Sequence, residues 1–137
     1  MTGSILAAAR AGKTPKIKPI TPKKWLDNLT LYIQEVGFLG LYGEEFRHYE
    51  FQRHHVLGKT AKHNKVAIGL FFVIPVPTHL HDVSSNHPDN VTHFKKRFTQ
   101  RFGPQREIFK KLCDGMKEWG FDIPPADVIE AIMDTSA

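Results

Sequence analysis

The stretch FQRHHVLGKTAKHNKVAIGLFFVIPVPTHLHD, residues 51–82, decides the fold because it contains most of the strand signal in the chain. Two sets of side chains alternate from Phe46 to Val56, and this period of two predicts a strand or one arm of a hairpin. The next run, residues 58–65, is polar and basic and predicts a loop.

A second strand is predicted after this loop. Residues 68–76 read IGLFFVIPV and are rich in β-branched and aromatic side chains, which is typical of a buried strand. Pro75 and Pro77 are expected to end it because neither can donate a ladder hydrogen bond. Residues 78–85, with Thr78 as the cap, then predict a short helix. The stretch as a whole therefore predicts two strands followed by a helix.

Helices are predicted on both sides of this stretch. Thr21 and Pro22 suit an N-cap and a first helical position, and apolar residues continue at helical spacing until Gly37. Apolar residues at the same spacing predict three further helices, from Asp89 or Asn90 to Phe102, from Pro104 to Trp119, and from Ala126 to Met133. The predicted class is α+β, with an N-terminal helix and two to three C-terminal helices around the strands.

Length and composition favour one domain. The 137 residues are enough for a single core and too few for two, and we expect a flexible basic arm over residues 1–20 and one domain over residues 21–137. No apolar run reaches the roughly 18 residues of a transmembrane helix, so no membrane partner is expected. The single cysteine, Cys113, excludes a disulfide framework. We expect a soluble, cytoplasmic protein of a bacterial or phage-infected cell.

Charge is distributed unevenly along the chain. Residues 1–24 carry six basic residues and no acidic one, and residues 52–119 carry twelve basic and five acidic residues. Residues 25–51 and 120–137 are both net acidic. A basic arm and a basic centre are typical of a protein that binds a polyanion such as DNA, although a solvated surface has the same composition.

Histidines suggest the chemistry of a site. Of the eight in the chain, His54 and His55 end the first predicted strand, and His79, His81 and His87 follow the second. Neighbouring strand residues face opposite sides, so His54 and His55 are expected to divide two tasks. One imidazole can hold a metal ion, while the other accepts a proton from water near neutral pH. Together these tasks would serve phosphodiester cleavage.

The order of these motifs resembles the HNH, or ββα-metal, nucleases. HHVLG at 54–58, VIP at 73–75 and THLHD at 78–82 follow one another as in that family. RFGPQREIF at 101–109 is similar to a later F-G-x-Q segment of phage-encoded members. The resemblance covers roughly residues 49–109. It implies a ββα-metal core and a metal-dependent DNA endonuclease of phage-type recombination or processing.

The resemblance also implies roles for single residues. His55 is expected to be the general base with Asn64 as a second catalytic residue, and His54, His81 and His87 are expected to hold one divalent metal ion. Zinc, manganese, nickel and magnesium are all candidates, and magnesium suits a histidine site least because it prefers oxygen ligands.

Two departures from the family keep other functions open. Pro77 occupies the place of a cysteine that most members have, and Asn64 comes earlier than the family's middle residue. The alternatives are a catalytically inactive HNH-like DNA-binding module and an interaction protein stabilised by one zinc ion. Asn64 also suits a turn, and His54 and His55 also suit a strand end without chemistry.

A set of basic residues is predicted to contact duplex or branched DNA, mainly at its phosphates. They lie in the loop after the first strand and on the helix that ends at residue 102: Lys59, Lys62, Lys65, Lys95, Lys96, Arg97 and Arg101. On that helix, Phe94, Phe98 and Phe102 recur every fourth residue and are interpreted as a core face and not as a base-stacking surface.

Overall fold

The computed structural model describes residues 19–38, 40–43, 46 and 50–137. Its helices and strands are α2 (Pro22–Val36), β1 (Phe51–His55), β2 (Lys62–His63), β3 (Val66–Ala67), β4 (Val73–Pro77), the 3₁₀ turn η2 (Thr78–Leu80), α3 (Lys95–Phe102), α4 (Gln105–Glu118) and α5 (Ala126–Met133). The predicted mixed α+β class is confirmed. The predicted arm lies outside the described residues except for Pro19 and Ile20.

Helix α2 begins and ends at the predicted residues. The Thr21 hydroxyl accepts a hydrogen bond from the backbone N–H of Lys24 at 3.2 Å, and Pro22 is the first helical residue. Gly37 ends the helix with φ 81°, where its N–H bonds the carbonyl of Ile33 at 2.7 Å.

Strands β1 and β4 form an antiparallel pair with Phe51 opposite Pro77 and His55 opposite Val73. Both predicted strands extended too far toward the N-terminus. The first begins at Phe51, and part of its predicted N-terminal extension, residues 47–49, lies outside the described residues. In the second, residues 68–71 form turns and not a strand, because the chain folds over Trp25, whose Nε1–H bonds the Phe71 carbonyl at 2.9 Å.

Strand β4 ends at Pro77, as predicted, but it continues through Pro75, which was also expected to end it. Thr78 donates to Glu50 and Val56 donates to Phe72, and this register places the ladder bonds at even-numbered residues. The nitrogens of both prolines therefore point away from β1, where no donor is needed. The outward carbonyl of Pro75 accepts a hydrogen bond from the Tyr42 hydroxyl at 2.6 Å.

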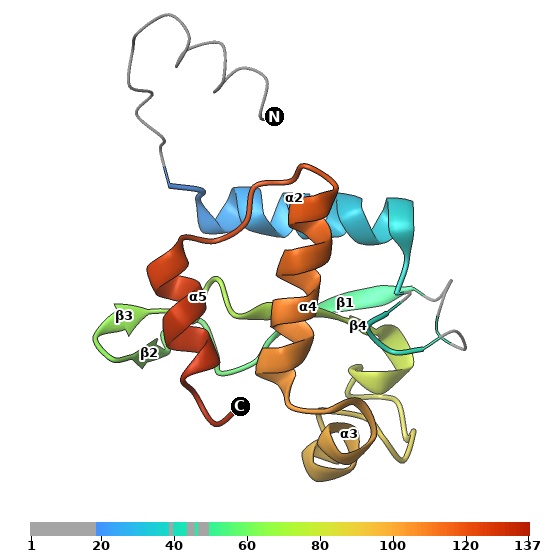
Figure 1. Ribbon diagram of the computed structural model, residues 1–137. Helices are drawn as coiled ribbons and strands as arrows, with labels where there is room; N and C mark the ends of the chain where they lie inside the picture. The colour runs from blue at the N-terminus through green and yellow to red at the C-terminus, as the bar shows by residue number, and fades with distance from the viewer. Residues whose placement is uncertain (1–18, 39, 44–45, 47–49) are drawn as a thin grey trace, which may run out of the picture.

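The predicted loop over residues 58–65 contains a strand. Residues of β2 pair with β3, and Asn64 and Lys65 form the turn between them with φ 49° and 65°. Two consecutive positive φ angles are typical of a tight two-residue hairpin turn. The hairpin packs beside α5 (Figure 1).

The helix predicted at residues 78–85 is one 3₁₀ turn, η2, and an irregular loop follows it to residue 94. Helix α3 consequently begins at Lys95, later than the predicted Asp89 or Asn90. Helices α4 and α5 agree with the prediction to within a residue or two at each end.

The core lies where α4 crosses α2 and the β1–β4 pair (Figure 1). Phe109 of α4 makes edge-to-face contacts with Trp25 of α2 and with Phe72, at ring distances of 5.9 and 5.5 Å. Cys113 is buried in the same core, and burial raises the pKa of its thiol to about 12. Within the described part of the chain, no helix has the length and apolar character to cross a bilayer.

Candidate functional site: a histidine pair beside helix α3

The centre of the site is a contact between His54, on β1, and His81, the residue after η2. His54 Nδ1 and His81 Nε2 lie 3.1 Å apart, and the two ring centroids are 4.9 Å apart. Strand β1 fixes His54 opposite Ile74, and the turn of η2 directly after β4 brings His81 back over β1. Two of the three predicted metal ligands thus meet.

Gln52 orients His81. It lies two residues before His54 on β1, so both side chains occupy one face of the strand. Its amide nitrogen donates to Asp82 Oδ2 at 2.9 Å, and its amide oxygen lies 2.5 Å from His81 Nδ1. Because the oxygen accepts the Nδ1 proton, the Nε2 of a neutral His81 presents a lone pair to His54.

Both imidazoles favour the neutral form. Burial, and after it the nearby His81, lower the pKa of His54 from its ordinary 6.5 to about 4. The pKa of His81 is also lowered, chiefly by burial, although Asp82 opposes the effect. Neutral imidazole is the form that binds a metal ion.

Gln105, at the start of α4, borders His54. Its side chain interacts with the imidazole and opposes the lowering of the His54 pKa. The Gln105 side chain is buried, and its Oε1 has no hydrogen bond of normal geometry within the described part of the chain. A neutral His54 with its proton on Nε2 directs the Nδ1 lone pair at His81.

Two facing lone pairs can share a proton or bind a cation. The ligand nitrogens of a tetrahedral zinc ion, each about 2.0–2.1 Å from the metal, lie about 3.3 Å apart. The 3.1 Å separation of His54 and His81 therefore fits two ligands of one ion. Among the described residues, no three His, Cys, Asp or Glu side chains gather as a metal-binding group.

His87, the third predicted ligand, lies beside another histidine. Its ring centroid is 5.3 Å from that of His79, which stacks on Phe46 at 5.5 Å. His87 Nδ1 accepts a hydrogen bond from the backbone N–H of Asp89 at 3.0 Å. The structure thus forms two separate histidine pairs and does not group His87 with the first pair.

His55, the predicted base, occupies the other side of β1. It lines a groove of about 750 Å³ together with residues of α2 and with Lys59. Burial lowers its pKa, and the charges of Lys59 and Arg53 lower it further. The strand therefore separates His55 from the side that carries His54, as the alternation of strand side chains requires.

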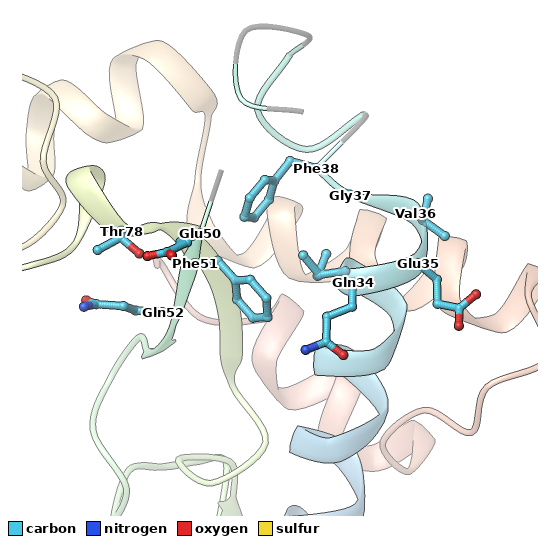
Figure 2. Close-up of a pocket in the computed structure, with 10 residues that line it drawn as sticks. Gln34, Glu35, Val36, Gly37, Phe38, Glu50, Phe51, Gln52 and Thr78 are labelled. Carbon is cyan, nitrogen blue, oxygen red and sulfur yellow. The ribbon is translucent and has the colours of Figure 1, made fainter. Parts of the chain in front are cut away.

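A neighbouring groove of about 720 Å³ lies between the end of α2 and the start of β1 (Figure 2). Gln34 of α2 and Phe51 of β1 extend toward each other there, and Glu35 and Glu50 add negative charge. The lining residues of the two grooves include Gln52 but neither His54 nor His81. The histidine pair therefore lies outside both grooves.

Asn64 lies at the tip of the β2–β3 hairpin. Its amide donates to Asp134 Oδ2 at 3.0 Å, and His63 Nε2 contacts the same oxygen at 2.9 Å. These bonds join the hairpin to the end of α5 and lower the pKa of Asp134. The side chain of Asn64 is thus engaged in an anchoring contact away from the histidine pair.

The predicted DNA-contacting residues fall into two groups. Lys59, Lys62 and Lys65 are exposed on and beside the hairpin, and Lys95, Lys96, Arg97 and Arg101 are exposed on α3. Lys95 is close enough to lower the pKa of His54 by its charge. Arg101 forms an ion pair with Asp89 at 2.8 Å, and its guanidinium lies over the Phe46 and Phe102 rings. Through Lys95, the α3 group is the one that reaches the histidine pair.

Sequence reasoning missed three polar residues of the site, Gln52, Gln105 and Asn90. Gln52 could have been found from its spacing of two from His54. The fully buried Asn90 shapes the loop before α3: its amide donates to the carbonyls of His79 and Asp82 and accepts from the N–H groups of Thr92 and His93. Gln105 belongs to the F-G-x-Q segment and Asn90 to a predicted helix start, but neither pattern gives their partners, which are set by the fold.

Comparison of the chain with protein families, curated proteins and solved structures gave no match. The function is therefore inferred from the site itself.

Proposed function

We propose that the chain is a metal-dependent DNA endonuclease of the HNH-like type, in which His54 and His81 hold one divalent ion. The observation that carries the proposal is the 3.1 Å approach of His54 Nδ1 to His81 Nε2, with Gln52 fixing the proton on the far nitrogen of His81. A hydrogen-bonded partner behind a histidine is the usual support of a metal ligand. In this proposal β1, β4 and η2 are the ββα-metal core, with its helix reduced to one turn.

The surrounding charges support a phosphodiester substrate. Lys95 lies near His54, and Lys96 and Arg97 extend the exposed positive surface along α3. Such side chains bind the phosphates of DNA without reading its sequence. A divalent ion bound beside them would stabilise negative charge on the scissile phosphate. With a DNA substrate, the protein is proposed to act in the cytoplasm of a bacterial or phage-infected cell.

His55 is proposed as the general base because of the family resemblance. Two observations about the predicted catalytic residues favour a second candidate function. His55 lies on the opposite side of β1 from His54, and Asn64 is bonded to Asp134. Both observations favour an HNH-like module that binds DNA without cutting it. The two functions differ in turnover and share the binding surface.

Nicking of supercoiled plasmid distinguishes the endonuclease from the DNA-binding module. Wild type, His54→Gln, His81→Gln and His55→Ala are compared with zinc, manganese, nickel and magnesium, with a chelator control. His63→Gln is the matched control because His63 lies on the hairpin beside Asp134. The endonuclease proposal expects cutting by wild type and His63→Gln, and loss of cutting in the other three variants.

The contrary outcomes separate the candidates. DNA binding without cutting under every metal would select the binding module. Cutting that survives His54→Gln and His81→Gln would overturn the assigned metal ligands. A sharp rise of the melting temperature with zinc, in the absence of any DNA binding, would select the zinc-stabilised interaction protein.

A further inference from the structure

Phe94 is an aromatic side chain that the fold leaves in solvent. The spacing of Phe94, Phe98 and Phe102 predicts three core residues, and Phe98 is fully buried as expected. Phe94 is 43% exposed, because α3 begins only at Lys95 and Phe94 belongs to the loop before it. Its backbone N–H bonds the carbonyl of the buried Asn90 at 2.7 Å, which fixes the backbone from which the ring extends.

Positive and polar groups surround this ring. Lys95 and Lys96 follow it in sequence and are exposed. The guanidinium carbon of Arg97 lies 5.6 Å from the ring centroid, and the His93 ring lies 6.3 Å from it. An exposed aromatic ring among cations is the arrangement with which proteins bind single-stranded nucleic acid, because bases stack on the ring while cations hold the phosphates.

The chain segment that carries Phe94 contacts the histidine pair. Thr92, two residues before Phe94, donates its hydroxyl proton to the carbonyl of His81. Lys95, the next residue, acts electrostatically on His54. A phosphate held at Lys95 and the histidine pair would therefore place an adjoining base within reach of the Phe94 ring.

We propose that Phe94 is a stacking platform for an unpaired base, and that single-stranded or locally unpaired DNA is the substrate class of this site. The inference rests on the proposed function and narrows it. A paired base in a continuous duplex stays stacked on its neighbours and cannot reach the ring, whereas an unpaired base can. The bases of an intact duplex are therefore expected not to stack on Phe94.

Fluorescence anisotropy with labelled DNA tests the inference in the full-length protein. Wild type, Phe94→Ala, Phe94→Leu and Phe94→Trp are titrated with one short single strand and with the same strand in a duplex. Leu31→Ala is the matched control, because Leu31 is 49% exposed on α2 and lies outside the basic surface. Melting temperatures show whether each variant is folded.

The expected result is a loss in single-strand affinity of about 5- to 150-fold in Phe94→Ala, as for removal of one stacked base. Phe94→Leu loses affinity similarly although it keeps an apolar side chain, Phe94→Trp retains it, and duplex affinity stays unchanged in all variants. Unchanged single-strand binding in Phe94→Ala and Phe94→Leu would overturn the inference and leave the proposed function standing. Equal losses on single strand and duplex would also overturn it. Wild type that binds neither form would overturn the proposed function itself.

Discussion

His54 Nδ1 and His81 Nε2 lie 3.1 Å apart although 27 residues separate them in the chain. The His54 ring belongs to a strand and the His81 ring follows a 3₁₀ turn. Gln52 bonds the far nitrogen of His81, and the Gln105 side chain interacts with His54. Two neutral imidazoles in this position have facing lone pairs unless a proton or a metal ion lies between them. The pair can therefore bind a proton or a cation between its rings, and it makes the protein sensitive to pH.

We predict that the protein loses stability as the pH falls from about 6.5 to 4. The His54 pKa is about 4 in the folded chain and near 6.5 when unfolded, so the unfolded chain binds the proton first. The contribution is fully present above pH 6.5 and is lost as the pH falls through 4, by about 3 kcal/mol.

Urea unfolding at several pH values measures this change, with chelator present. His54→Gln should flatten the dependence in that range. An NMR titration gives an independent check, and an imidazole of His54 that titrates near 6.5 would contradict the prediction.

Gln52→Leu should weaken metal binding, because it removes the acceptor that orients His81. Loss of such a supporting bond typically reduces metal affinity about 10- to 100-fold. Calorimetric titration with zinc and manganese measures the affinity. Gln34→Leu is the control, since Gln34 shares the groove with Gln52 but comes from α2. Equal affinities in the two variants would mean that Gln52 does not support a ligand.

Asn64→Gly and Asn64→Ala should separate a turn role from a catalytic one. Glycine adopts φ 49° without strain, whereas alanine there costs about 1 kcal/mol, and both variants lack the bond to Asp134. If the side chain only supports the turn, plasmid nicking stays at the wild-type level in both variants, and Asn64→Ala is the less stable. A stable Asn64→Gly variant that has lost nicking would assign Asn64 to catalysis.

Gly69→Ala should destabilise the protein by several kcal/mol, because an added Cβ would lie 2.5 Å from the Lys59 carbonyl oxygen and also collide with that of Gly58. These are backbone atoms, so the segment itself must move. Gly58→Ala is the comparison, since its φ of 85° is strained for alanine but its Cβ enters open space, and about 1 kcal/mol is expected. Thermal unfolding measures the loss of stability in both variants. Equal losses would show that the close approach at Gly69 is easily relaxed.

The sequence by itself determined the helices whose signals are local. Thr21, Pro22 and Gly37 define α2, and the glycine–proline boundaries before α4 and α5 locate those helices to within a residue or two. Capping and breaking residues act on their own neighbours, so the chain carries this information directly. The alternation in β1 likewise determined that His54 and His55 face opposite sides.

Only the tertiary structure decided which side chains meet. The pairing of His54 with His81 depends on the β1–β4 register, and the bond of Asn64 to Asp134 on the packing of the hairpin against α5. The exposure of Phe94 follows from the loop that Asn90 holds, which delays α3. Each of these contacts joins residues whose separation is set by the fold, and no pattern of neighbouring residues encodes such a distance.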